Sequence, residues 1–171
     1  MMPNFEPIRG AQGYQQSNPS VLATASLLGS LQVFKQAGMM QPLRKRSLQL
    51  TGTLESLLSR SRFFVPLQDM TDWCARIGNE VHTSSRTYSF GFTIITPANA
   101  EDRGAMLSLM ILPPGKTEIM EQVFNTLMSF GVVGDKRNPS VIRLSPAPLF
   151  NSLHDCQRAA DALEKAFEML S

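Results

Sequence analysis

The run Val141-Ile142-Arg143-Leu144 places a single arginine among apolar residues, in a stretch with the character of a buried strand. A guanidinium group stays charged at ordinary pH and is rarely buried without a partner, so an arginine in this setting usually faces an anion. That anion is either a ligand or a carboxylate of the chain itself. Alternation along a strand leaves a further alternative, in which Arg143 lies on a solvent-exposed face.

A second candidate site lies at Ser17-Asn18-Pro19. By itself this pattern predicts the start of a helix, with Asn18 as the N-cap and Pro19 in the first helical position, where its missing N–H costs nothing. The residues alone therefore favour a structural role for Asn18.

Two other patterns resemble functional motifs but do not meet their requirements. Gly115-Lys116-Thr117 resembles the end of a phosphate-binding P-loop, but the position required for the first glycine of that motif is Met110. His82 and His154 are far apart in sequence, and His154 falls in the first turn of an expected helix, so we predict no metal site.

Composition argues for an ordinary globular chain without a nucleic-acid or membrane partner. The 171 residues are 43% hydrophobic and carry a formal net charge of +2, and the one basic run, Arg44 to Arg46, is too short for a polyanion-binding patch. Cys74 and Cys156 have no metal-ligand spacing and suit a reducing compartment. With no apolar segment of membrane-spanning length and no apolar leader, the chain is expected to be cytoplasmic.

Hydrophobic periodicity predicts the elements that must position these residues. Residues 60–89 are expected to be a long variable connection with one helical turn at most and Trp73 as its anchor, and Asp135 to Arg137 a charged turn. A small sheet with packed helices is expected after Ser89, preceded by two helices that need a further surface to pack against. Helices are predicted over 19–37, 41–59 and 117–130 and from Ser152 onward, and strands over 89–96, 104–112 and 141–145.

Three collinear blocks of the sequence resemble one family, kynureninase, the pyridoxal-phosphate enzyme of tryptophan breakdown. The first block carries Y-Q-Q-S-N-P-S-V and F-K-Q-A-G-M-M-Q-P-L-R-K-R-S-L-Q-L-T-G, and the second I-T-P-A-N-A-E-D-R-G-A-M-L-S-L. The third is G-V-V-G-D-K-R-N-P-S-V-I-R-L-S-P-A-P-L-F-N. The resemblance covers only the C-terminal part of such an enzyme.

This resemblance implies a fold and a domain division. The expected class is α/β, or α+β in isolation, consisting of the end of the large domain and the C-terminal small domain of a fold-type-I pyridoxal-phosphate enzyme. The expected parts are residues 1–60 at the end of the large domain, a variable connection at 61–88, and a small α+β domain at 89–171.

The resemblance also implies roles for individual residues. The family's arginine in the I-R-L/V-x-P segment grips the α-carboxylate of the substrate, and Arg143 matches it. The asparagine of the Ser-Asn-Pro motif contacts the cofactor or the substrate, so Ser17 and Asn18 are candidate substrate-binding residues and Asn18 a candidate cofactor contact. Asp135 and Arg137 match the family as well and are expected to hold their turn.

The implied activity is hydrolysis of L-kynurenine or 3-hydroxykynurenine to anthranilate or 3-hydroxyanthranilate plus L-alanine, with pyridoxal phosphate held as a Schiff base on a lysine. None of the five lysines has the family's S-x-x-K-Y-like context, so no catalytic residue is predicted here. These lysines are Lys35, Lys45, Lys116, Lys136 and Lys165. Two alternatives follow. The chain is a C-terminal portion that works as a homodimer or with a kynureninase large domain, or it is a non-catalytic remnant that binds a full-length kynureninase.

Overall fold

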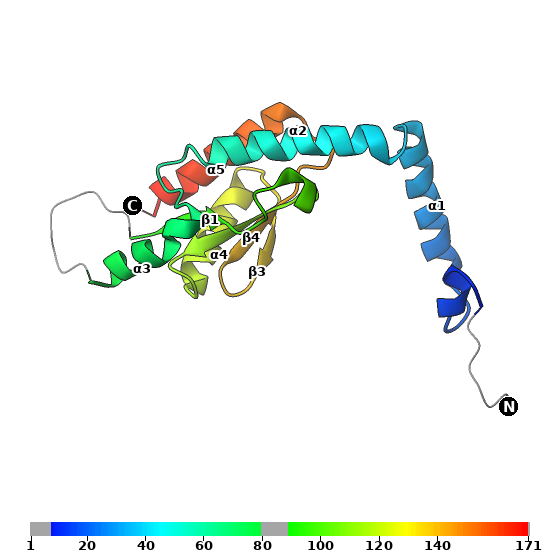
Figure 1. Ribbon diagram of the computed structural model, residues 1–171, viewed down its shortest axis with the longest axis horizontal. Coiled ribbons are helices and arrows are strands. Elements are labelled where there is room, and N and C mark those ends of the chain that lie inside the picture. Colours follow the sequence, from blue (N-terminus) through cyan, green and yellow to red (C-terminus); the bar gives the residue numbers. More distant parts are fainter. Residues whose placement is uncertain (1–7, 80–88, 171) are drawn as a thin grey trace. The chain divides into compact units, whose positions relative to one another are not determined.

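The computed structural model describes residues 8–79 and 89–170 (Figure 1). His82 lies outside the described residues. Contacts divide the chain into two compact units, Met1–Pro42 and Leu43–Ser171. The division falls within a helix, and the family-based boundaries at residues 60 and 88 stay predictions.

The first unit contains a short 3-10 helix, η1 (Ala11–Tyr14), and the helix α1 (Val21–Gln36). Ser20, not Asn18, is the N-cap of α1, since its hydroxyl accepts a hydrogen bond from the backbone N–H of Ala23 at 3.4 Å. The predicted cap was therefore wrong by two residues. The sequence offers two competing cap residues on either side of Pro19, and the helix uses the later one. As predicted, α1 ends before Gly38, whose φ of 85° is typical of a residue that terminates a helix.

α1 is apolar on all sides. It has no charged residue between Val21 and Phe34 and no buried residue. A helix with this composition is normally buried in a larger protein. Its large exposed side chains are Val21, Leu22, Leu27, Leu28, Leu31 and Val33, with exposed fractions from 49% to 80%.

The second unit is built on a four-stranded antiparallel sheet in the order β1-β2-β4-β3. The strands are β1 (Gly91–Ile94), β2 (Leu107–Leu112), β3 (Asp135–Arg137) and β4 (Val141–Leu144). Three of them confirm the sequence prediction. The fourth corrects it, because the charged segment Asp135–Arg137 pairs with β4 as an edge strand, and residues 138–140 form the turn.

Three predicted helices, α2 (Met40–Leu58), α4 (Thr117–Ser129) and α5 (Leu153–Glu168), pack with the sheet. α2 and α5 lie side by side (Figure 1), and the thiol of Cys156 reaches the carbonyl of Leu50 at 3.6 Å. The mixed helices and small sheet agree with the predicted α/β class. The largest fully buried side chains are Phe63, Phe92, Phe167, Leu50, Leu54, Leu58, Leu107, Leu109, Ile111, Leu112, Met120 and Leu127.

The segment that follows α2 is more ordered than predicted. It contains the 3-10 helix η2 (Leu67–Asp69) and the helix α3 (Met70–Asn79), where one turn at most was expected, and Trp73 is only partly buried. Phe64 bridges Phe92 of β1 in parallel register, so the chain adds a short contact at that edge of the sheet.

An aromatic cluster joins this segment to the last helix. The ring of Phe167 stacks on Phe63, Phe92 and Phe90 at centroid distances of 5.1, 5.6 and 6.3 Å. Stacked aromatic pairs at these distances stabilise a core beyond the area they bury. The cluster fixes α5 against both β1 and the segment before it.

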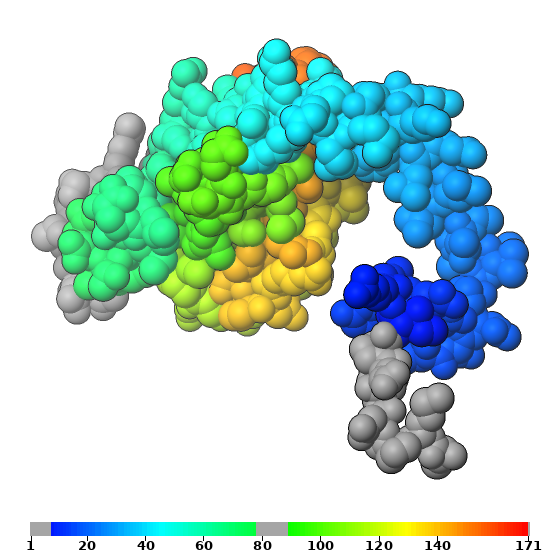
Figure 2. Space-filling view, turned by 45° about the vertical axis from the view of Figure 1, so that its right-hand side comes forward, coloured from blue at the N-terminus to red at the C-terminus, as the bar shows by residue number. Residues whose placement is uncertain are grey.

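A buried ion pair ties the 3-10 helix η3 (Ala100–Asp102) to α2, and Figures 1 and 2 show the two elements against each other. The side chain of Arg103 is only 3% exposed and binds both oxygens of Glu55 through Nη1 and Nη2. The hydrogen bond to Glu55 raises the pKa of Arg103 above its usual value. Arg44 adds hydrogen bonds to the carbonyls of Ala100 at 2.7 Å and Arg103 at 2.9 Å.

Candidate carboxylate-binding site

The position of Arg143 follows from alternation along β4. Ile142 and Leu144 are buried against the helices, so Arg143 points to the opposite face of the sheet. Its side chain is 27% exposed, which excludes both a fully buried and a freely solvated guanidinium. The structure shows an internal carboxylate partner for Arg143, and the ligand alternative stays a prediction.

That carboxylate belongs to Asp135, which lies directly opposite Arg143 in the β3–β4 ladder. Its Oδ2 accepts hydrogen bonds from Nε of Arg143 at 2.7 Å and from Nη2 of the same side chain. Nη2 of Arg137 lies 3.1 Å from the same oxygen. The sequence indicated Asp135 and Arg137 only as turn residues, because the edge strand that aligns them was not predicted.

One end of the Arg143 guanidinium stays available. Within residues 8–79 and 89–170, Nη1 of Arg143 forms no hydrogen bond. On the same face, Ser108 of β2 lies opposite Arg143 and is half-buried. Two arginines and one aspartate leave this surface with a net positive charge. It can bind an anion whose oxygens approach from the free end of the guanidinium.

Ser17 and Asn18 lie in the first unit, in an exposed segment without regular secondary structure before α1. Because Ser20 caps α1, Asn18 is not engaged as a cap. The structure brings Arg143 together with Asp135 and Arg137, whereas Ser17 and Asn18 belong to the other unit.

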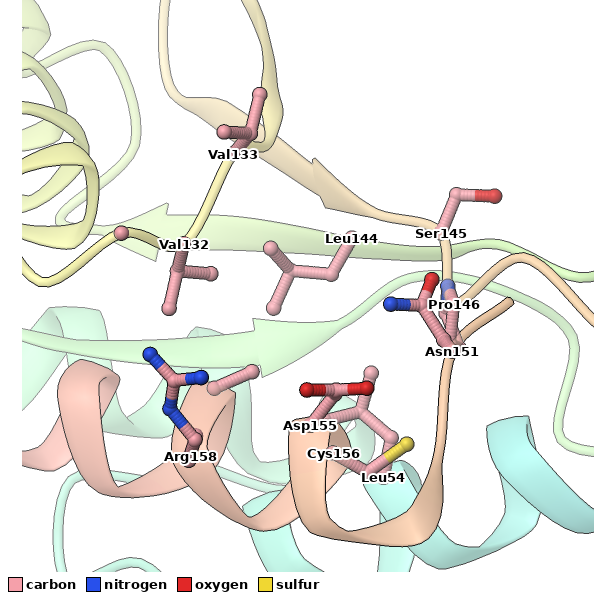
Figure 3. A pocket seen from close by; sticks show the side chains of 12 residues that line it. Leu54, Val132, Val133, Leu144, Ser145, Pro146, Asn151, Asp155, Cys156 and Arg158 are labelled. Carbon is pink, nitrogen blue, oxygen red and sulfur yellow. The ribbon is translucent and has the colours of Figure 1, made fainter.

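The face of the sheet opposite Arg143 holds a cavity of about 150 Å³ between β4 and α5 (Figure 3). Val132 and Leu144 point into it, and Asp155 lines it from the start of α5. Asp155 and Ser152 form a capping box at the start of α5. The backbone N–H and the hydroxyl of Ser152 donate to the Asp155 carboxylate and lower its pKa. Its carboxylate is thus engaged in capping α5.

Cys156 is the reactive side chain type in this cavity, but its surroundings make it inert. The residue is 2% exposed, and burial raises the pKa of its thiol. Only the thiolate is an effective nucleophile. We therefore assign Cys156 to the core.

The described residues do not form a site that fits a Schiff-base cofactor. All five lysines are exposed: Lys35, Lys45, Lys116, Lys136 and Lys165. Lys136 pairs with Glu121 at 2.6 Å, and Lys165 lies 5.5 Å from the ring centroid of Phe130. In the same part of the chain, no cluster of side chains could hold a metal ion, and no helix is long and apolar enough to cross a membrane.

Comparison with known proteins identifies relatives over the whole length of the chain. Residues 75–163 match the family model of the kynureninase C-terminal domain. The chain is 40% identical to a kynureninase of Yarrowia lipolytica over 172 residues, 100% of this chain and 36% of the relative. It is 41% identical to a kynureninase of Saccharomyces cerevisiae over 173 residues, 99% of this chain and 35% of the relative.

A kynureninase of Cryptococcus neoformans var. neoformans is also 41% identical over 168 residues, which cover 98% of this chain and 33% of the relative. The chain therefore spans about a third of the length of the curated relatives that it matches.

Proposed function

The chain belongs to the kynureninase family, and from this premise we propose that it forms the carboxylate-binding C-terminal part of a kynureninase-type hydrolase. The reaction is addition of water across the Cβ–Cγ bond of L-kynurenine or 3-hydroxykynurenine, which gives anthranilate or 3-hydroxyanthranilate and L-alanine. The observation that carries the proposal is the half-buried Arg143 with one end of its guanidinium available.

In this function, Arg143 binds the α-carboxylate of the substrate. A planar guanidinium donates two parallel hydrogen bonds to a carboxylate, which fixes the orientation of the bound amino acid as well as its position. Asp135 occupies the edge of the guanidinium formed by Nε and Nη2. The N–H groups suited to the substrate contact are therefore those of Nη1 and the N–H of Nη2 that points away from Asp135. Asn18 supplies a contact to the cofactor or to the substrate, and Ser17 a further substrate contact, supported by their exposure and by the location of the helix cap at Ser20.

Pyridoxal phosphate supplies an electron sink when bound. Since all five lysines here are exposed, we assign the Schiff-base residue to a large domain that acts together with this chain, within a homodimer. The apolar helix α1 supports such an assembly because it exposes large side chains that a partner surface would bury. Two free cysteines suit a cytoplasmic location.

The test replaces the matching C-terminal segment of the S. cerevisiae relative with residues 1–171 of this chain. The chimera is expected to release anthranilate from L-kynurenine, measured by fluorescence. Arg143→Ala should raise KM about 30-fold or more, because it removes a charge-assisted pair, and should leave the cofactor absorption intact. Asn18→Ala should change the ratio of kcat/KM between L-kynurenine and 3-hydroxykynurenine.

Unchanged kinetics in Arg143→Ala would contradict the carboxylate assignment. Equal effects of Asn18→Ala on the two substrates would contradict a role for Asn18 in choosing between them. A chimera that binds cofactor but does not turn over would contradict the catalytic proposal itself.

A second candidate function is non-catalytic binding to a full-length kynureninase. The exposed lysines and the apolar surface of α1 favour it. Here the separately expressed chain should form a complex with the full-length S. cerevisiae relative, seen as an increase in mass by light scattering, without activity of its own.

A further inference from the structure

The short edge strand β3 brings a second functional group to Arg143. Asp135 lies directly opposite Arg143, and Arg137 opposite Val141, so both β3 side chains lie on the face that carries Arg143. Directly opposed residues in an antiparallel pair have Cβ atoms about 5 Å apart, within reach of a short carboxylate. Lys136, between them, points to the other face and pairs with Glu121.

The contacts divide the Arg143 guanidinium into two edges. The edge formed by Nε and Nη2 is held by a single oxygen, Oδ2 of Asp135. The same oxygen also lies 3.1 Å from Nη2 of Arg137. Nη1, at the other end of the Arg143 guanidinium, forms no hydrogen bond in the described part of the chain. The pairing therefore restrains the side chain without occupying the end that faces away from Asp135.

We propose that Asp135 is the positioning residue of the carboxylate site, anchored by Arg137, and that it holds Arg143 in the orientation that receives the substrate carboxylate. This inference rests on the proposed function. A flexible arginine loses rotamer freedom when it binds a ligand, and a side chain that is already held loses less. Asp135 also separates two guanidinium groups that would otherwise repel each other, while the trio keeps a net charge of +1.

A competing role for Asp135 predicts that KM changes in the opposite direction. If Asp135 instead competed with the ligand for Arg143, removal of its charge would strengthen carboxylate binding. Asp135→Asn keeps the shape of the side chain and removes the charge, so the direction of the change in KM separates the two roles.

In the chimera, Asp135→Asn is expected to raise KM for L-kynurenine about tenfold, since a charge-assisted hydrogen bond becomes a neutral one. The turnover number kcat should stay within about twofold, because the substrate is still processed once bound. Asp135→Glu, which keeps the charge, should give a smaller increase. Lys136→Ala is the matched control on the same strand and should leave KM unchanged.

A second measurement tests directly, in the 171-residue chain, whether Asp135 holds the Arg143 guanidinium. Hydrogen exchange of the Arg143 Nε–H, followed by ¹⁵N NMR and assigned with Arg143→Lys, should be slow in the native chain and fast in Asp135→Asn. A lower or unchanged KM in Asp135→Asn would overturn the proposal, as would an unchanged exchange rate. If Arg143→Ala leaves KM unchanged, the proposed function fails, whereas the exchange experiment still reports whether Asp135 holds the guanidinium.

Discussion

At the scale of single residues, the second unit pairs three of its buried or partly buried arginines with groups of its own. Arg103 is held by Glu55, Arg143 by Asp135, and Arg44 by two backbone carbonyls. The three arginines differ in how accessible their guanidinium groups remain. The pair formed by Arg103 lies under η3 and is closed to solvent on the arginine side, whereas Arg143 keeps one end free. The same side chain type therefore forms a closed ion pair in one place, whereas in the other it leaves a group for the ligand contact proposed above.

The Arg103–Glu55 pair yields a prediction about stability. Glu55→Ala leaves the buried Arg103 guanidinium without a counter-charge and is expected to cost about 3 kcal/mol of unfolding free energy. The double substitution Glu55→Leu with Arg103→Met should cost much less, because both charges are removed together. Urea denaturation followed by circular dichroism measures both.

The control for this prediction is Glu121→Ala, which breaks the more exposed pair with Lys136. Such pairs contribute about 0–1 kcal/mol. A loss in Glu55→Ala no larger than in Glu121→Ala would show that the Arg103 pair does not hold η3 on α2.

At the scale of elements, helix ends carry the clearest local signals. α5 begins with a reciprocal pair, in which the Asp155 N–H donates to the Ser152 hydroxyl at 3.2 Å and the Ser152 N–H donates to the Asp155 carboxylate at 2.8 Å. Two donors that the first turn would leave unpaired are satisfied at once. α4 ends at Ser129, and Gly131 follows its C-cap with a φ of 77°, a left-handed conformation that glycine adopts readily.

The capping box predicts how α5 responds to acid. Hydrogen bonds from Ser152 lower the pKa of Asp155 in the folded chain. The stabilisation is thus fully present above the unfolded pKa, about 4, and is lost as pH falls through the lower folded value. Asp155→Asn should reduce the urea midpoint at pH 7 and flatten its decline below pH of about 4.

Asp161→Asn, on the exposed side of the same helix, controls for the loss of one negative charge from α5. It should reduce the midpoint at pH 7 less than Asp155→Asn does. Equal midpoints for the two variants would indicate that the box contributes only its charge.

Most elements could be predicted because their side chains are periodic. The leucines of α2, the apolar faces of α4 and α5, and the strands β1, β2 and β4 all bury one face in a single core. β3 was missed because Asp135, Lys136 and Arg137 have no apolar face, and an edge strand needs none. Phe63 and Val65 were missed because their burial depends on pairing beside β1, a long-range contact that no local pattern reports.

The candidate site, too, could be predicted from the sequence only in part. An arginine among apolar residues could be recognised from the sequence as needing an anion. That the anion is Asp135, and that only one edge of the guanidinium is used, depends on the β3–β4 register. The roles of Ser17 and Asn18 stay predictions from the family resemblance.

At the scale of the whole molecule, the two units differ in how they bury apolar residues. The second unit has a continuous core of strands and helices, whereas α1 in the first unit has no buried residue. Packing of an apolar face supplies most of the stability of a helix in water. α1 is therefore expected to find a partner surface, which is a property of the assembly and not of either unit.

This imbalance predicts self-association of the purified chain. Leu27→Gln with Leu31→Gln, at positions 59% and 50% exposed, should lower the average mass measured by light scattering and reduce binding of a hydrophobic dye. Ser26→Gln with Ser30→Gln places the same side chains on the same helix without removing apolar surface. Equal masses for both double variants would contradict a role for α1 in association.

The aromatic cluster around Phe167 also bears on the order in which the chain is made. The ring of Phe167, which lies on α5, is synthesised after the three rings that stack on it, those of Phe63, Phe90 and Phe92. The contact between Ser61 and Glu164 spans 103 positions in the same region. During synthesis, which proceeds from the N-terminus, the sheet must wait for α5 with these rings uncovered. The nascent chain thus has an interval in which chaperones or premature contacts compete for the surface that α5 finally covers.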